Sequence, residues 1–438
     1  MLNLSFSPRN RLYTDLNSYT QFLGYALKGR LQNNTNTKDK DIEVFEHELR
    51  VRFSSRYAVC VSQCRLGLYF AVKTLIQPGQ EVILSPYTIA DVINMVIFAG
   101  GRPVFADLDR STCNLSPSDV ESLINSNTGA VMVTHLHGVA AEAHRIKEIC
   151  DRANIPLIED CAQSFGVEEQ GKPVGTIGDV GVFSLEMHKN LPTWRGGVVV
   201  TEREDVIEKM RAEAKDFTTS PLPLISAKVK SGLKHDLVTS PIFFPLVYPI
   251  LRYSTLNKVE AIEKSTRRKP QESEAGTELP DVYKSYFTSF QARIGLSQLK
   301  KVDANIDKRI EYGRMYHEGL KDIDELILPP LRADKSITYL WYPLQCPDRE
   351  ELRQFMFEHG RDVALGHFIN NADTERFAEY YRDCPNARSI AQSVLYLPTY
   401  PSYSRRDVEK NIEVIQLYFK SQTKIEQEAV QERVLLSN

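Results

Sequence analysis

From Phe45 to Thr201 the sequence alternates between short apolar runs and longer segments in which apolar residues recur at helical spacing. Runs such as YAVCV and VMVT have the length and β-branched content of buried strands. The segment DIEVFEHEL places Ile42, Phe45 and Leu49 on one helix face. Repeated alternation of strand and helix is typical of an α/β fold, with a mostly parallel sheet and helices on both faces. We expect strands at residues 56–61, 82–84, 104–107, 130–134, 156–158, 180–183 and 198–200, and helices at 41–53, 62–76, 115–124, 145–153 and 205–214.

The last third of the sequence predicts a second, smaller α+β unit. Val302 to Leu320 has the spacing of one long helix that crosses to this unit, and the charged tail from Gln422 is expected to fray. We expect strands at 339–346 and 363–368 and within 394–401, and helices at 348–358 and 405–420. The chain therefore divides into an N-terminal arm (1–40), a large domain (41–215), an insertion (216–280), return helices of the large domain (281–310) and a small C-terminal domain (311–438).

The centre of the insertion is an apolar run interrupted by proline, SPIFFPLVYPILRY, within residues 236–255. Pro241, Pro245 and Pro249 should prevent one straight helix. An apolar wedge with a basic rim suits a membrane surface. The alternative is an apolar flap over the active site or a dimer interface. The flanking basic residues are Lys228, Lys230, Lys234, Arg252, Lys258, Arg267, Arg268 and Lys269.

Composition narrows the class of protein. A net charge of −3 over 438 residues gives no basis for a nucleic-acid partner. Seven scattered cysteines, with no signal-peptide pattern in MLNLSFSPRN, indicate reduced thiols and a cytoplasmic protein. No uninterrupted apolar run is long enough to span a bilayer. Cys60 and Cys64 lie close together, but no further Cys or His pair completes a zinc pattern.

One stretch, VGVFSLEMHKNLPTWRGGVVVT, carries the candidate chemistry. It places Lys189 in a polar turn between two buried runs, after Ser184 and before the pair Gly196-Gly197. A lysine held between buried strands has a lowered pKa and can act as an amine nucleophile. Asp160 ends another apolar run upstream. A lysine that bonds the cofactor, together with an Asp on the pyridinium nitrogen, is the protein's part of pyridoxal phosphate (PLP) chemistry.

A second candidate site is the turn SQCRLGL, which follows the first strand and opens a helix. Free N–H groups and the positive dipole end at such a junction can cradle a phosphate. Cys64 lies in this turn, and Arg65 could add charge. The alternative is an Arg at an ordinary solvated helix start.

His135 and His137 alternate at the end of a predicted strand. Two alternating histidines can suggest a metal, but no third ligand is near in the sequence. A hydrogen-bonded histidine, or one near the substrate, is favoured over a metal site.

Taken together, these motifs resemble the DegT/StrS family of sugar aminotransferases, which are fold-type I PLP enzymes. The resemblance rests on Glu159-Asp160-Cys161-Ala162-Gln163, on Gly175-Thr176-Ile177-Gly178-Asp179, on Ser184 followed by Lys189, and on Gly196-Gly197. It extends from about Phe45 to Tyr418, with both order and spacing matching. It implies a large, mostly parallel sheet domain with helices on both faces and a small C-terminal α+β domain.

The resemblance also implies roles for individual residues. Lys189 would bond the cofactor and then act as the acid and base of catalysis, while Asp160 would keep the pyridine nitrogen protonated. Gln163 would lie at the phenolic oxygen of the ring or stack near it, and Ser184 would hold the phosphate with Arg65 and the amides near Cys64. Ile89 stands where the family commonly has an aromatic that stacks on the ring, so either Ile89 or Tyr87 covers it.

Lys284 stands where the family has an Asn that reaches the partner subunit's phosphate. Glu186 replaces a frequent His, and Arg195 a frequent Glu, on either side of Lys189. The two changes that flank Lys189, at Glu186 and Arg195, favour an unusual substrate.

By resemblance, the chain transfers an amino group from glutamate or glutamine to a keto-sugar, nucleotide-linked or presented on a lipid or membrane. The product would enter cell-surface glycans or secondary metabolites. A homodimer is implied, because the family builds its site from two chains, and contact of 236–255 with the inner face of the membrane is a further expectation. The alternative from another class is a catalytically weak homologue that serves as a binding or scaffold subunit.

Overall fold

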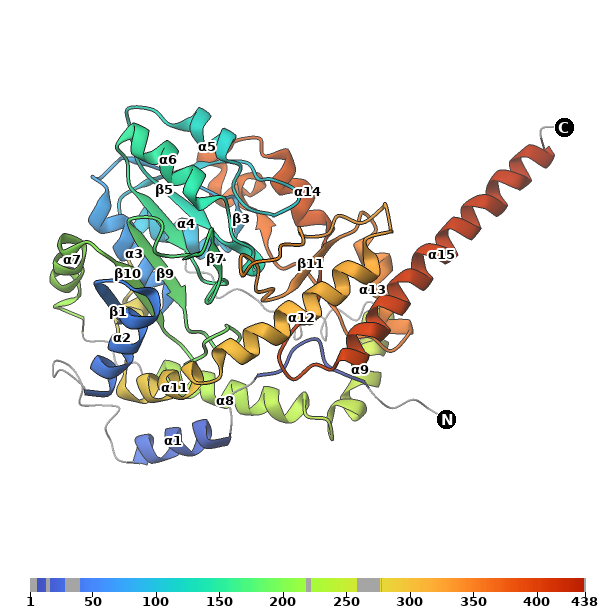
Figure 1. Ribbon diagram of the computed structural model, residues 1–438, viewed down its shortest axis with the longest axis horizontal. Coiled ribbons are helices and arrows are strands. Elements are labelled where there is room, and N and C mark those ends of the chain that lie inside the picture. Colours follow the sequence, from blue (N-terminus) through green and yellow to red (C-terminus); the bar gives the residue numbers. More distant parts are fainter. Residues whose placement is uncertain are drawn as a thin grey trace.

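The computed structural model describes residues 6–12, 16–27, 40–217, 222–257, 276 and 278–436, without the side chains of 423–436. Its centre is a seven-stranded sheet with the order β1-β10-β9-β6-β5-β2-β4 (Figure 1). Each strand overlaps a run expected from the sequence, so the existence of these strands is confirmed, with bounds that differ by up to two residues at either end. The strands are β1 (Tyr57–Val61), β2 (Glu81–Leu84), β4 (Arg102–Phe105), β5 (Thr128–Thr134), β6 (Leu157–Asp160), β9 (Val180–Ser184) and β10 (Gly197–Thr201).

The sheet is mostly parallel, as predicted. The pairs β2–β4, β2–β5, β5–β6 and β6–β9 are parallel, whereas β9–β10 and β10–β1 are antiparallel. Every residue of β5, β9 and β10 is buried, because helices cover both faces and leave no polar side of the sheet. The antiparallel turn between β9 and β10 is the segment that contains Lys189.

Helices follow the strands in sequence. Five of them confirm the helical segments expected in this half of the chain. The observed helices of the first half are α1 (Leu16–Leu27), α2 (Lys40–Phe53), α3 (Cys64–Leu75), α4 (Ala90–Phe98), α5 (Pro117–Leu123), α6 (Ala143–Ala153) and α7 (Glu204–Ala214).

A second sheet lies beside the first, with the order β11-β14-β12. Its own apolar core forms between this sheet and the helices α12 and α15, with Tyr316, Tyr342 and Leu397 fully buried. In Figure 1 the long helix α12 runs diagonally from the large sheet to this smaller one. The elements here are α11 (Ser289–Leu299), α12 (Val302–Leu320), β11 (Tyr342–Gln345), α13 (Arg349–Glu358), β12 (Ala364–Leu365), α14 (Pro385–Ser393), β14 (Val394–Leu397) and α15 (Arg405–Leu436).

The prediction of a frayed tail from Gln422 is wrong, because α15 continues to Leu436. A small two-stranded pairing ties the two units together, since β3 (Tyr87–Thr88) pairs with β13 (Ile369–Asn370). The division into domains with boundaries near 215, 280 and 310 stays a prediction.

The insertion folds as two helices, α8 (Leu222–Val238) and α9 (Phe244–Leu256), so no single straight helix forms. Pro241 lies in the turn between them, and Pro245 lies in the first turn of α9, where a missing N–H costs nothing. Pro249 does not end α9, which continues through it. The basic residues expected at 258–269 lie outside the described part of the chain.

Candidate active site

The carboxyl ends of β5, β6 and β9 meet at one edge of the sheet, where parallel sheets bind ligands. The register pairs Thr134 with Asp160, and Asp160 with Val182. Ser184 ends β9 and pairs with Gly197 across the antiparallel turn. The sheet thus brings the predicted residues of three strands to one edge.

Asp160 lies fully buried at the end of β6. Its Oδ1 accepts a hydrogen bond from the Ala162 amide at 3.0 Å. Burial raises the pKa of Asp160, and the Ala162 amide and the Lys189 ammonium oppose that rise. A carboxylate in this position is stabilised by a cation placed against it.

Gln163 is held in one orientation by the backbone. Its Oε1 accepts the N–H of His137 at 2.7 Å. Because the oxygen faces His137, the amide nitrogen is the end of Gln163 that is directed elsewhere and can donate. This orientation suits the predicted contact with a phenolic oxygen.

Residues 185–196, which we call the lysine loop, form a compact turn between β9 and β10. Leu185 N–H donates to Gly196 O at 2.9 Å, Thr193 N–H to Leu185 O at 2.8 Å, and Lys189 N–H to Glu186 O at 2.9 Å. The charge of Lys189 lowers the pKa of both Asp160 and His137, which places its amine near both. The structure therefore brings together Lys189 and Asp160, the two residues predicted to carry the chemistry.

The predicted phosphate turn packs directly against the lysine loop. Cys64 is the first residue of α3, and Gly197 follows the loop. A Cβ at Gly197 would lie 2.7 Å from both the Cα and the N of Cys64, so only glycine permits this approach. Burial raises the pKa of the Cys64 thiol, with Asp160 adding to the rise. The thiol is therefore protonated. The backbone amides of the turn, and not the thiol, are the groups that could bind a phosphate.

Arg65 already has an anionic partner. Its guanidinium forms an ion pair with the buried Asp91 of α4 and donates to the Tyr283 hydroxyl at 3.3 Å. The Tyr283 hydroxyl in turn donates to Asp91 at 3.2 Å. Burial opposes the charged form, but Asp91, Tyr283 and Glu186 together outweigh it and raise the pKa of Arg65. Arg65 thus does more than cap a solvated helix start, and its phosphate role stays a prediction.

Ile89 and Tyr87 have different environments. Ile89 precedes α4 as its N-cap and is partly buried. Tyr87 is fully buried, with its ring edge-on to Phe368 at 5.5 Å and 6.3 Å from the His137 ring. This packing holds Tyr87 against the smaller unit.

Lys284 lies at the end of a short 3-10 turn, and its Nζ contacts Asp281 Oδ1 at 2.8 Å. Both side chains are exposed, so this ion pair holds Lys284 weakly. Its contact with a partner chain stays a prediction.

The two histidines after β5 behave differently. His135 Nε2 contacts Glu159 Oε2 at 3.0 Å, and its Nδ1 accepts the Ala141 amide at 3.1 Å. Glu159 also accepts three backbone amides, from residues 175, 177 and 178. Cys161 lies near this pair, but every ring nitrogen is already used, so the group is a structural brace.

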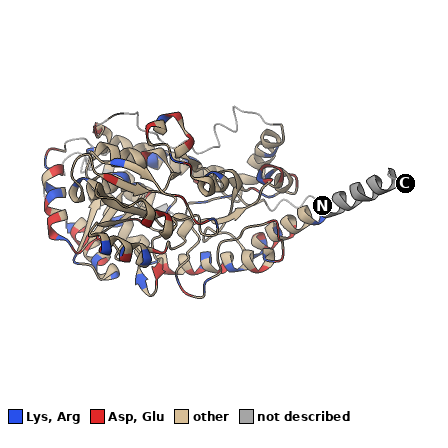
Figure 2. Ribbon diagram, turned by 90° about the horizontal axis from the view of Figure 1, so that it is seen from above, with Lys and Arg blue, Asp and Glu red and all other residues tan. Residues whose placement is uncertain are grey.

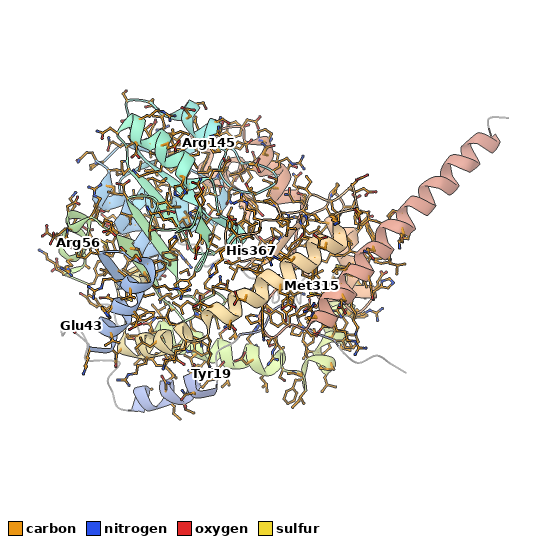
Figure 3. The ribbon with its side chains drawn as sticks, viewed as in Figure 1. Tyr19, Glu43, Arg56, Arg145, Met315 and His367 are labelled. Atoms are coloured by element: carbon orange, nitrogen blue, oxygen red, sulfur yellow. The ribbon has the colours of Figure 1, made fainter. Side chains whose placement is uncertain are left out.

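His137 is fully buried, and neither ring nitrogen has a partner among the described residues. Its backbone is left-handed, with φ of 59°, and it is fixed by Leu340 N–H donating to His137 O at 2.9 Å. Burial, with Lys189 adding to it, lowers the pKa of His137 to about 3. His367, which is labelled in Figure 3, packs against two of the rings that His137 contacts, Phe368 and Tyr396.

Two contacts near Lys189 escaped the sequence analysis. Lys228 of α8 pairs with Glu186, and Tyr283 bridges Arg65 and Asp91. The partners lie 42 or more residues apart, so no local spacing signals them.

Comparison with known proteins matches these elements to one family. The family model of the DegT/DnrJ/EryC1/StrS aminotransferases covers residues 21–220 and 254–416, and passes over most of the insertion. The spore coat polysaccharide biosynthesis protein SpsC of Bacillus subtilis is 27% identical over 90% of this chain and 96% of its own. GDP-perosamine synthase of Vibrio cholerae is 27% identical over 85% of each chain.

A crystal structure of NtdA from Bacillus subtilis with the cofactor PMP bound has the same fold. It superposes with a TM-score of 0.70 at 19% identity, covering 93% of this chain and 83% of that one.

Proposed function

The chain belongs to the DegT/DnrJ/EryC1/StrS aminotransferase family, a family of PLP-dependent enzymes, and we propose that it aminates a nucleotide-linked keto-sugar at the Lys189 site. The observation that carries this proposal is the convergence of Lys189, Asp160 and the turn at Cys64 on one edge of the sheet. The relatives named for GDP-perosamine and for spore coat polysaccharide support a sugar acceptor and a role in glycan biosynthesis.

The residues present fit PLP. The buried Asp160 carboxylate, whose pKa burial raises, gains the cation it needs from a pyridinium N–H. The close approach of Gly197 to Cys64 leaves the amides at the start of α3 as a phosphate cradle. When bound, PLP supplies an electron sink for cleavage at the substrate carbon.

We assign the following roles to the chain's own residues. Lys189 would bond the cofactor and, once released, take and return a proton at its Nζ. Asp160 would hold the ring nitrogen protonated, and Gln163 would donate from its amide nitrogen to the phenolic oxygen. Ser184 and the amides near Cys64 would hold the phosphate, with Arg65 adjacent, and Ile89 would cover the ring.

The amino donor proposed is glutamate or glutamine. We also propose a homodimer in which the exposed Lys284 reaches the phosphate of the partner chain. As an ammonium it would bind that phosphate as a point charge.

Contact with an anionic membrane surface is the finer part of the proposal. Ile242, Leu246, Ile250 and Tyr253, which we call the apolar stripe, are between 58% and 78% exposed. Their spacing places them on one face at and just before α9. Arg252 beside them, with Lys230 and Lys234 on α8, is exposed and basic, which complements anionic lipid. We found no helix among the described residues that is long and apolar enough to cross a bilayer.

A flotation assay tests the membrane contact. The double variant Leu246→Gln with Ile250→Gln should lose binding to vesicles rich in phosphatidylglycerol. Leu417→Gln, at an exposed leucine on α15, is the matched control and should bind as the original does. Equal binding by all three would refute the contact, and a stripe-dependent change in size on gel filtration would assign the stripe to a second copy instead.

The absorbance spectrum with and without added PLP tests the main proposal. We expect a band from the lysine-bound cofactor that Lys189→Ala lacks and that glutamate bleaches. Absence of the band at every PLP concentration would refute it.

A further inference from the structure

Helix α8 lies within the segment that the family model passes over, yet it packs against the lysine loop. Trp194 and Met187 of the loop share a small apolar core with Ile225 and Val229 of α8. In Figure 1 α8 runs along the lower edge of the molecule, beside α11. An element outside the two matched ranges therefore supports the loop that carries Lys189.

The packing between α8 and the loop is close. A Cβ at Gly232 would lie 2.2 Å from Cζ3 of Trp194 and 3.1 Å from Cε of Met187. The rings of His188 and His235 approach edge to face, with centroids 5.4 Å apart. Tyr19 of α1 packs edge-on against Trp194 at 5.0 Å and donates to Asp236 of α8 (Figure 3). Trp194 is thus fixed from two sides.

One ion pair links α8 to the polar side of the loop. Lys228 Nζ lies 2.7 Å from Glu186 Oε1, with side chains 37% and 21% exposed. Glu186 is three residues before Lys189, and its carbonyl accepts the Lys189 N–H at 2.9 Å. The residue that Lys228 binds therefore also closes the backbone turn that presents Lys189.

Glu186 also has other cations near it. Its charge favours the charged forms of both Arg65 and Arg195. Burial and the nearby Arg65 lower the pKa of Arg195 to about 10. Without Lys228, the Glu186 carboxylate would be attracted toward these two arginines and away from α8.

We propose that Lys228 is a positioning residue for the reaction: through its ion pair with Glu186 it holds the lysine loop and sets the electrostatic environment of Lys189. The proposal deepens the proposed function, on which its catalytic meaning rests. The packing of α8 fixes the loop, and the ion pair fixes the carboxylate three residues before Lys189.

The two single substitutions should act on Lys189 in opposite directions. Lys228→Met removes one positive charge beside Glu186, so more of the negative charge of Glu186 acts on Lys189, which stabilises the ammonium of Lys189 and raises its pKa. Glu186→Gln removes that negative charge and lowers the pKa. Each shift should be about 0.5, the size expected across a partly screened distance. The double variant removes a neutral pair and should return close to the original.

Competitive acetylation of the cofactor-free chain, read by peptide mass spectrometry across pH, measures the Lys189 titration directly. Lys73→Met, at an exposed lysine of α3, is the matched control and should leave the titration unchanged. A purely structural role would move both single variants the same way. Such parallel shifts, or no shift in either, would overturn the proposal.

A second readout separates this proposal from the proposed function. With PLP bound, Lys228→Met should lower turnover on the order of tenfold with the donor KM unchanged, and Glu186→Gln should add little to it. If the original chain shows no cofactor band but the opposite shifts of Lys189 are present, the proposed function fails and the positioning holds. If turnover is normal in Lys228→Met and the shifts are absent, the positioning fails alone.

Discussion

Replacing His137 by Asn should make the chain's stability less sensitive to acid. The imidazole is fully buried, and burial together with Lys189 lowers its pKa to about 3. In the unfolded chain the same group has a pKa of about 6.5. Below pH 6.5 the unfolded state therefore binds a proton that the folded state does not, and stability falls as the pH falls toward 3.

The size of the effect follows from the two pKa values. A pH of 5 is about 1.5 units below the pKa of His137 in the unfolded chain, so the imidazole is protonated there. In the folded chain the imidazole stays neutral at this pH. At about 1.36 kcal/mol per unit, folding loses about 2 kcal/mol between pH 7 and pH 5. Asn has no such titration and tolerates the left-handed backbone at φ of 59°. Its constant cost, from lost packing against Tyr396, does not depend on pH.

Urea unfolding of both cofactor-free chains at pH 7 and pH 5 measures the effect. The stability difference between the original and His137→Asn should shrink by about 2 kcal/mol at the lower pH. Other groups titrate in both chains and cancel in the difference. If the difference is the same at both pH values, His137 does not carry a lowered pKa and the reasoning is refuted.

Other substitutions test the packing and the charge of the site. Gly232→Ala should lower the free energy of unfolding, measured in urea, by up to about 2 kcal/mol. Overpacking against Trp194 costs about 1–3 kcal/mol, and the better helix propensity of Ala offsets about 1 kcal/mol of that cost. Gly24→Ala, at a helix position with open space around the new Cβ, should instead stabilise by about 0.5–1 kcal/mol, and equal effects would contradict the packing argument. Asp160→Asn should weaken PLP binding on the order of a hundredfold in absorbance titrations, because an amide cannot balance a buried pyridinium, and an unchanged affinity would remove Asp160 from that role.

The strands could be predicted because their burial is continuous. The runs at β5, β9 and β10 are apolar at every position, and a strand buried on both faces leaves that pattern in the sequence. The direction of β1 could not be read in this way, since an apolar run looks the same in a parallel and an antiparallel pair. The place of the break could not be read either, because α9 continues through Pro249 in spite of the lost hydrogen bond, and the turn lies at Pro241.

The contacts of the candidate site also fall into those that the sequence predicts and those that it does not. Lys189, Ser184 and Asp160 stand at fixed places relative to strand ends, so their meeting follows from the order of strands in the sheet. The pairing of Arg65 with Asp91 and of Glu186 with Lys228 depends on how helices pack, and no sequence spacing records it. The unpartnered nitrogens of His137 become visible only once the neighbouring residues are placed.

The insertion joins two properties that the sequence presented as alternatives. Its buried side covers the lysine loop, because Gly232 and Lys228 contact that loop. Its exposed side carries the apolar stripe and basic residues of both helices. Over the ribbon as a whole, Lys and Arg are mixed with Asp and Glu (Figure 2). Tyr248 of α9 stacks on Phe357 of α13 at 6.1 Å, so the stripe is attached to the smaller unit while α8 is attached to the large one. A ligand that binds the stripe therefore acts on the insertion, which contacts the smaller unit through α9 and the lysine loop through α8.

Membrane binding and the titration of Lys189 should then be coupled. Anionic vesicles should shift that titration in the original chain but not in the variant with Leu246→Gln and Ile250→Gln.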